Sequence, residues 1–404
     1  MQQANAPAPS GGAGSLALGA GGSGSGRAAR SPGRRPEGSA VMTTLRLSQT
    51  GNRIELSGGN RSVAYAIAGV DLPELTDMSF AVWHMLPLAM KSGTDLHVDG
   101  PVDPLTCENA ERMSRTWELW RPQDFRAVKV TALPGGPRRT GRKEELVMFS
   151  GGVDSTYMLL ERGRRPEPVA ALTVQGMEYG HGADAQFQRS LRHSQPLLDA
   201  LNYRRITVTS DLRRSVKGYH TYASVIAGYA FLFGDLFEAG LFAADLSWEQ
   251  DLLLFPWSLN HVTNRYFVSG DFSCRAVNDD VTRAQKVEAI AESPVALASV
   301  SFCIDKTIRP QNCGKCRKCM RTKAMFAGLT GGVPEGVFLD ASPPYITHAD
   351  MLGDERAFIF DLYQRVRDRG RLDAVPGLQE AVDGFLARGR WQRRWDRLLK
   401  RRSR

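Results

Sequence analysis

One short segment of the chain has the residue types of a loop that binds phosphate groups. Its sequence is Ser150-Gly151-Gly152-Val153-Asp154-Ser155-Thr156. Glycines let the backbone turn tightly and approach a ligand closely, and free N–H groups at the start of a helix attract anions. The hydroxyl groups of Ser150, Ser155 and Thr156 add further donors. We therefore expect residues 150–156 to bind the phosphates of a nucleotide.

The carboxylate of Asp154 is an unexpected group in such a loop, because it repels phosphate. Its presence is explained if Mg²⁺ joins the carboxylate to the phosphate oxygens. The segment lacks the Gly-Lys-Ser/Thr sequence of a Walker loop. The sequence therefore predicts a different type of nucleotide-phosphate loop, with Asp154 as a catalytic residue.

Four of the six cysteines follow the pattern C-x9-C-x2-C-x2-C, and they are Cys303, Cys313, Cys316 and Cys319. The two short gaps bring three thiolates together from one tight turn, where Gly314 eases the backbone. Cys303 completes the set from a preceding loop, and nearby Lys and Arg side chains offset the negative charge. This pattern predicts a structural zinc site. An Fe–S cluster is the main alternative, because C-x2-C-x2-C also occurs in ferredoxins, and metal-free thiols are the other.

Both motifs need a scaffold, and apolar strands alternate with helices around the glycine loop. Strands are expected at 145–149, 169–174, 205–209 and 240–244, and helices at 154–161, 183–201 and 222–236. This alternation predicts an α/β fold with a doubly wound parallel sheet, whose ligands bind at the carboxyl ends of the strands.

Several further side chains are predicted to lie near this edge of the sheet. Thr173 ends the second strand, so we expect it to approach the nucleotide. Arg283 and Lys286 open a later helix, and one of them is expected to contact phosphates. Asp245, Trp248 and Glu249 follow the fourth strand, and Trp248 and Glu249 are candidates for an acceptor pocket, the alternative being surface or packing roles.

The composition divides the chain into five regions. Residues 1–41 are rich in Gly, Ala, Ser and Pro and are predicted to be disordered, with Met42 as an alternative start. Residues 42–133 form an N-terminal α+β region, and 134–144 a linker. The nucleotide-binding domain with its cysteine cluster spans 145–335, and a helical region with a basic tail spans 336–404.

The composition also bounds the function. The chain has 404 residues, 42% of them hydrophobic, and lacks both a long apolar run and a signal peptide. We therefore expect a cytoplasmic protein without membrane contact. The net charge of +9 is concentrated at the two ends of the chain. The basic tail is weak support for nucleic-acid contact, and a solvated helix end explains it equally well. A homodimer is compatible with these features.

The glycine loop resembles the Ser-Gly-Gly-x-Asp-Ser loop of the PP-loop ATP pyrophosphatases. Together with the cysteine cluster it resembles, over roughly 145–330, the 7-cyano-7-deazaguanine synthases, zinc-containing enzymes of queuosine biosynthesis. The stretch 312–319 is similar to that family's zinc knuckle, and 179–181 (Tyr-Gly-His) to its Tyr-Gly-Gln element. Thr282-Arg283-Ala284 is similar to its Thr-Lys-Ala, with Arg283 in place of a phosphate-directed lysine. The long segments on either side of the resemblance depart from that family.

The resemblance implies a PP-loop (HUP-type) fold with ATP, Mg²⁺ and Zn²⁺ as cofactors. It also implies a ligase that adenylates a carboxylate or amide oxygen of a small-molecule or nucleobase-like acceptor and releases pyrophosphate. Ammonia or an amine then displaces AMP, with Asp154 and Arg283 as the catalytic residues. Two alternatives remain open, namely a PP-loop enzyme that transfers sulfur to tRNA and a non-catalytic nucleotide-binding regulatory module. The sequence does not identify a general base.

Overall fold

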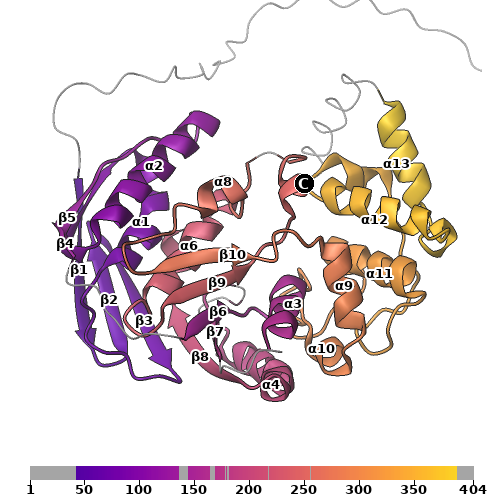
Figure 1. Ribbon diagram of the computed structural model, residues 1–404, viewed down its shortest axis with the longest axis horizontal. Coiled ribbons are helices and arrows are strands. Elements are labelled where there is room, and N and C mark those ends of the chain that lie inside the picture. Colours follow the sequence, from indigo (N-terminus) through magenta and orange to yellow (C-terminus); the bar gives the residue numbers. More distant parts are fainter. Residues whose placement is uncertain are drawn as a thin grey trace, which may run out of the picture. The chain divides into compact units, whose positions relative to one another are not determined.

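The structure is a computed structural model that describes residues 42–135, 144–163, 169–177, 179, 182–216, 218–254 and 256–388. The predicted disordered segment 1–41, most of the predicted linker, His181 and the basic tail from 389 onward lie outside these residues. Within them, ten strands form one mostly parallel sheet in the order β10-β9-β6-β7-β8-β3-β2-β1-β4-β5 (Figure 1). The predicted α/β class is confirmed. None of the described helices is both long and apolar enough to cross a membrane.

Five parallel strands carry the glycine loop. They are β6 (Glu145–Met148), β7 (Val169–Gln175), β8 (Tyr203–Ser210), β9 (Ala239–Ala243) and β10 (Ser273–Val277). Numbered from β6 along the chain, their order in the sheet is 3-2-1-4-5, and every neighbouring pair is parallel. The direction of winding therefore reverses between β6 and β9.

The other five strands come from the N-terminal region. A meander of β1 (Met42–Thr50), β2 (Arg53–Gly58) and β3 (Arg61–Ala68) is antiparallel, and β4 (Asp95–Val102) and β5 (Val130–Pro134) join β1 in parallel. Strand β3 pairs antiparallel with β8. The strands of the predicted 42–133 and 145–335 regions therefore share one sheet.

Helices cover both faces of the sheet, because alternate strand residues point to two separate cores. Leu146 and Leu172 pack with the core of α1 (Ser79–Ser92), α2 (Pro104–Trp120) and α6 (Tyr222–Phe231). Val147 and Ala171 pack with the other core, and its helices are α3 (Val153–Arg162), α4 (Asp184–Ala200), α9 (Arg283–Ala291), α10 (Pro294–Ser299), α11 (Arg317–Thr330), α12 (Arg356–Asp368) and α13 (Leu378–Ala387).

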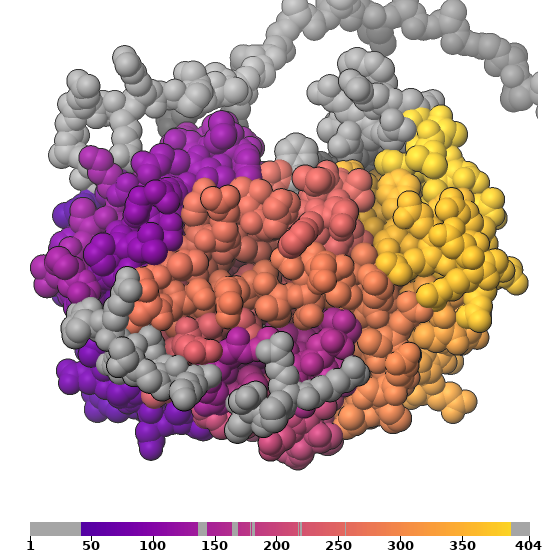
Figure 2. Space-filling view, in the orientation of Figure 1, coloured from indigo at the N-terminus to yellow at the C-terminus, as the bar shows by residue number. Residues whose placement is uncertain are grey.

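Short helices complete the fold. They are α5 (Leu212–Ser215), α7 (Trp248–Asp251) and α8 (His261–Asn264), with 3₁₀ turns at Tyr219–Thr221, His348–Leu352 and Leu372–Ala374. The predicted C-terminal helices correspond to α12 and α13. On the face drawn in Figure 2, these yellow helices and the indigo N-terminal strands lie on opposite sides of the middle segments of the chain.

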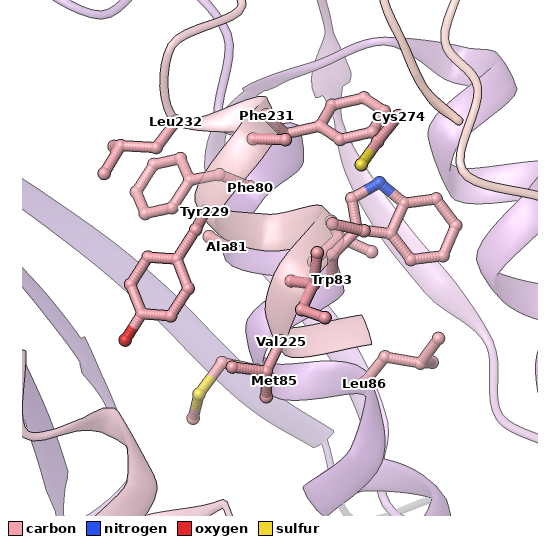
Figure 3. Packing of buried hydrophobic residues seen from close by; sticks show 14 of the residues in the cluster. Phe80, Ala81, Trp83, Met85, Leu86, Val225, Tyr229, Phe231, Leu232 and Cys274 are labelled. Atoms are coloured by element: carbon pink, nitrogen blue, oxygen red, sulfur yellow. The ribbon is translucent and has the colours of Figure 1, made fainter. Parts of the chain in front are cut away.

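Helices α1 and α6 cross closely over one face of the sheet, and Figure 3 shows the aromatic side chains around the crossing. A Cβ atom on Gly228 would lie 2.1 Å from Cδ2 of His84, so only glycine fits there. His84 is fully buried, with Nδ1 2.9 Å from Tyr65 Oη and Nε2 3.2 Å from the Val225 carbonyl oxygen. Because Nε2 faces a carbonyl group, the neutral ring donates from Nε2 and accepts at Nδ1.

We expect His84 to make the protein sensitive to acid. Burial lowers the pKa of His84 from 6.5 to about 3, so between these values the unfolded chain binds a proton that the folded chain does not. Stability is therefore full above pH 6.5 and falls at about 1.4 kcal/mol per pH unit as pH drops through this window. Urea unfolding of the wild type and of His84→Gln at several pH values measures the difference. His97→Gln, at a strand position near the surface, is the control, and parallel pH profiles for the wild type and His84→Gln would contradict the expectation.

Candidate functional site

The carboxyl ends of β6, β7 and β9 open into a cavity of about 520 Å³. Its walls include Phe149 after β6, Thr173 and Val174 on β7, and Ala243 and Asp245 at the end of β9. In open α/β sheets a ligand binds where the direction of winding reverses, and here that point lies between β6 and β9. The cavity therefore lies where this topology favours ligand binding.

The glycine loop connects β6 directly to α3, as the sequence predicted. Gly151 has a φ of +76°, a backbone conformation that favours glycine, and its carbonyl oxygen accepts a 2.7 Å hydrogen bond from the Ser301 N–H group. The loop serines also bond to the loop itself. Ser155 Oγ lies 3.1 Å from Ser150 Oγ, and the Gly152 N–H group donates to Ser150 Oγ over 3.3 Å. These hydroxyl groups therefore hold the loop in shape.

Most of the predicted loop residues face the cavity. Those that line it are Ser150, Gly152, Val153, Asp154 and Ser155. Gly151 and Thr156 do not line it. Thr156 is fully buried, and its Oγ1 atom has no hydrogen-bond partner within the described part of the chain. Its hydroxyl group therefore lies under the loop instead of on the cavity wall.

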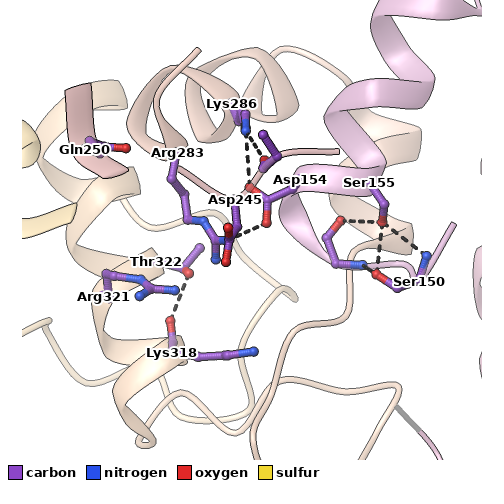
Figure 4. A network of polar contacts seen from close by, with 12 residues as sticks. Ser150, Asp154, Ser155, Asp245, Gln250, Arg283, Lys286, Lys318, Arg321 and Thr322 are labelled. Carbon is purple, nitrogen blue, oxygen red and sulfur yellow. Dashed lines mark hydrogen bonds and ion pairs between the residues drawn. The ribbon is translucent and has the colours of Figure 1, made fainter. Parts of the chain in front are cut away.

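Asp154 is paired with two cations from the first turn of α9 (Figure 4). One carboxylate oxygen meets Nη2 of Arg283, and the other lies 3.5 Å from Nζ of Lys286. Lys286 is fully buried and also donates to the Ala244 carbonyl oxygen over 2.5 Å. Arg283 lines the cavity, whereas Lys286 is enclosed behind Asp154. Of the two predicted phosphate contacts, only Arg283 is thus on the cavity wall.

The charge of the cavity wall favours an anionic ligand. Four cationic side chains line it, namely Arg213, Arg283, Arg309 and Lys318. The only carboxylates among the described lining residues are those of Asp154 and Asp245. A cleft with an excess of one charge concentrates ligands of the opposite charge. A phosphate-bearing molecule fits this balance.

Asp245 occupies the end of β9, and its Oδ1 accepts a 3.1 Å hydrogen bond from Nε1 of Trp257. Burial raises the pKa of Asp245 to about 6, and the negative charge of Asp154 adds to this effect. Asp245 and Trp257 both line the cavity, whereas the two predicted acceptor-pocket residues, Trp248 and Glu249, are exposed and do not. Trp257 was not among the residues singled out for the site, because its link to Asp245 is a contact across a loop.

Thr173 lines the cavity from β7, as expected for the end of that strand. Its Oγ1 atom accepts a 3.1 Å hydrogen bond from Nη1 of Arg205 on β8. Burial lowers the pKa of Arg205 to about 10, but the guanidinium group remains a cation at neutral pH. Because Arg205 has already donated to Thr173, the hydroxyl hydrogen of Thr173 is available to a ligand.

The four clustered cysteines form a candidate metal centre. Their sulfur atoms all lie within 4.8 Å of one another, and two pairs, Cys303–Cys316 and Cys313–Cys319, are 3.9 and 3.8 Å apart. Four sulfurs bound to one zinc ion at ~2.3 Å in a tetrahedron lie ~3.8 Å apart, so these separations fit zinc. The predicted grouping of the four cysteines is confirmed, because their thiols lie close enough together to hold one metal ion.

The backbone of this turn also suits a metal site. Gly314 has a φ of +78°, and a Cβ atom there would lie 2.6 Å from the Asp340 carbonyl oxygen. The N–H groups of Lys315 and Cys316 donate to Cys313 Sγ over 3.3 and 3.2 Å. Hydrogen bonds lower the pKa of Cys316, and the one with the Cys319 side chain has the largest effect.

The metal centre adjoins the cavity. Nε of Arg309 donates to the carbonyl oxygen of Cys303 over 2.6 Å, and Lys318 lies between two of the cysteines in sequence. Arg309 and Lys318 both line the cavity. The cysteine turn therefore positions two of the four cations on the cavity wall.

Taken together, the glycine loop, the helix start and the excess of cations can bind a polyphosphate next to two carboxylates. The cysteine cluster offers four thiol ligands and leaves no open position for catalysis on a tetrahedral metal. No protein-family model, curated protein or solved structure matches this chain.

Proposed function

We propose that this chain is an ATP-dependent ligase of the PP-loop type. It adenylates a carboxylate or amide oxygen, releases pyrophosphate and transfers the acyl group to ammonia or an amine. The observation that carries this proposal is the position of five loop residues that line the cavity where the direction of winding reverses, namely Ser150, Gly152, Val153, Asp154 and Ser155. Asp154 and Arg283 lie at the same point.

The strand order supports the proposed fold type. The order 3-2-1-4-5 with all neighbours parallel is that of a doubly wound sheet, the arrangement implied by the resemblance to PP-loop enzymes. A volume of about 520 Å³ lies within the range of small-molecule sites. The polar end of the cavity suits the phosphates, and its apolar wall, with Tyr222, Ile226 and Leu259, suits a flat ring.

The residues present also fit Mg²⁺. This ion takes oxygen ligands, usually one or two carboxylates together with substrate phosphates, and Asp154 in the phosphate loop reaches the cavity. Bound there, Mg²⁺ would neutralise charge on the phosphates. The chain's own contribution is positional and electrostatic, because the N–H groups of the loop and the Arg283 guanidinium group stabilise charge at the phosphates.

The cysteine cluster has a structural role in this proposal, as a zinc knuckle that holds Arg309 and Lys318. Sulfur transfer to tRNA would need a persulfide-carrying cysteine near the nucleotide. Cys107 and Cys274 lie outside the cluster, and neither lines the cavity. The clustered thiols are better used as metal ligands.

We expect MgATP to bind at least 100-fold more tightly than adenosine, because the loop and the cations act on the phosphates. Isothermal titration calorimetry with the two ligands measures this ratio. The catalytic step is tested by pyrophosphate release with MgATP, ammonium chloride and a panel of heteroaromatic carboxylates. Equal affinities for ATP and adenosine would contradict the proposed phosphate site. Tight MgATP binding without pyrophosphate release from any member of the panel would favour a regulatory nucleotide-binding module.

A further inference from the structure

The second half of the proposed reaction needs a group that removes a proton. When ammonia or an amine attacks an acyl carbon, the nitrogen becomes positively charged, and a base within reach must accept its proton. Among the described residues that line the cavity, none is a histidine, and the two carboxylates are those of Asp154 and Asp245. The candidate carboxylate bases are therefore these two side chains.

Both oxygens of Asp154 are already engaged with cations. One meets Arg283, and the other lies 3.5 Å from Lys286. Its place in the phosphate loop also commits it to the nucleotide.

Asp245 has a different environment. Its one hydrogen-bond donor within the described part of the chain is the neutral indole N–H of Trp257, which reaches Oδ1 over 3.1 Å. No ion pair joins Asp245 to a described cation. The second carboxylate oxygen of Asp245 can thus accept a proton, because the indole group of Trp257 contacts only Oδ1 and fixes the orientation of the side chain.

The backbone next to Asp245 is fixed relative to the phosphate loop. Lys286 donates to the carbonyl oxygen of Ala244 over 2.5 Å and also reaches Asp154. This buried ammonium group therefore links the end of β9 to the start of α3. Figure 4 shows Asp245 beside Arg283 and Asp154 in this network.

We propose that Asp245 is the general base that deprotonates the attacking nitrogen. This inference rests on the proposed ligase function. Pyrophosphate has already left when the step begins. The nitrogen forms a bond to the acyl carbon, the bond from that carbon to the AMP oxygen breaks, and AMP leaves with the electron pair. The carboxylate of Asp245 takes the proton from nitrogen and later returns it to water.

The charge around Asp245 is compatible with this role. Its pKa is raised to about 6, because burial and the charge of Asp154 raise it by more than Arg283, Trp257 and Lys286 lower it. A carboxyl group with such a pKa is ionised at neutral pH and is a better base than an exposed aspartate.

Asp245→Asn tests the role, because its amide oxygen can still accept the bond from Trp257. Single-turnover experiments with MgATP and an accepted heteroaromatic carboxylate would follow pyrophosphate and AMP separately. We expect the pyrophosphate burst to stay within about 3-fold of wild type, while AMP release with ammonium falls by roughly 10²-fold. Glu249→Gln, an exposed change four residues further on, should leave both steps unchanged.

Hydroxylamine in place of ammonium separates base catalysis from positioning. Its nitrogen is a strong nucleophile but a much weaker base, so its attack depends less on proton removal. We expect hydroxylamine to restore most of the AMP release in Asp245→Asn. Equal losses in both steps, failure of this rescue, or wild-type AMP release in Asp245→Asn would each overturn the assignment. A wild-type protein that neither binds MgATP nor releases pyrophosphate would instead overturn the proposed function.

Trp257→Phe gives a second, independent readout. It keeps an aromatic ring at the cavity wall and removes only the donor to Asp245. We expect a smaller loss of AMP release than in Asp245→Asn, with the pyrophosphate burst retained. Unchanged melting temperatures in the variants would show that the losses are not due to unfolding.

Discussion

Replacing Asp154 with asparagine should lower pyrophosphate release by at least roughly 10³-fold, the rate equivalent of several kcal/mol of lost transition-state stabilisation. The carboxylate lies in the phosphate loop and pairs with Arg283 and Lys286, so its removal changes both the magnesium ligand set and the orientation of Arg283. Pyrophosphate release with MgATP and an accepted carboxylate measures the effect. The asparagine side chain still offers an oxygen to the two cations, and we therefore expect the fold to be retained.

The matched control is Glu161→Gln, which makes the same chemical change at an exposed position of the same helix, α3. It should keep wild-type turnover. Asp154→Ala is informative for a different reason, because it leaves the fully buried Lys286 without any side-chain oxygen at this position. Breaking a buried pair in this way costs roughly 3–5 kcal/mol, which urea unfolding can detect. Wild-type turnover in Asp154→Asn would remove the basis for the PP-loop mechanism.

Four of the five parallel strands were predicted, and β10 was not. All residues of β7 are buried, so the strand reads from Val169 to Val174 as an apolar run interrupted only by Thr173. The sequence signal of β3 is weaker, because only Val63, Tyr65 and Ile67 alternate with small or polar residues. Its pairing with β8 is a contact between strands far apart in the chain, which local patterns do not specify.

Two helices differ from the sequence prediction: one was not predicted, and the predicted range of the other was too long. Helix α2 was not predicted, although Asp103 caps it by accepting from the Leu105 N–H group and Pro104 occupies its first turn. The predicted helix at 222–236 was too long. It ends at Phe231, and the following residues form tight turns, such as the bond from the Gly234 N–H group to the Phe231 carbonyl oxygen. Apolar composition alone does not distinguish such turns from a helix.

The candidate site was predictable where its residues are close in sequence. The loop 150–156 and the cysteine spacing are local patterns, and the structure places most of these side chains together. The partners of Asp154 on α9 and the indole donor of Asp245 depend on tertiary packing. For the same reason the sequence could not tell that Lys286 lies behind Asp154 while Arg283 faces the cavity.

The second large effect concerns the metal. We expect one Zn²⁺ per chain, bound by Cys303, Cys313, Cys316 and Cys319, and measurable by elemental analysis of protein purified without added metal. Cys316→Ser should lose the zinc and lower the melting temperature by more than about 10 °C. Zinc binding to structural sites in zinc-finger peptides contributes about 10–16 kcal/mol to folding, as much as the whole stability of a typical domain.

The position of the cysteine cluster explains why the loss of zinc should also weaken ligand binding in the cavity. Cys303 and Cys319 are fully buried in the same core as α3 and α9, and Arg309 is bonded to the Cys303 carbonyl group. A disordered turn would therefore release Arg309 and Lys318 from the cavity wall, so we expect MgATP affinity to fall together with stability. Cys107→Ser, a half-buried change outside the cluster, should change neither property. Iron with acid-labile sulfide would overturn the zinc assignment, and a Cys316→Ser protein with wild-type stability would overturn the structural role.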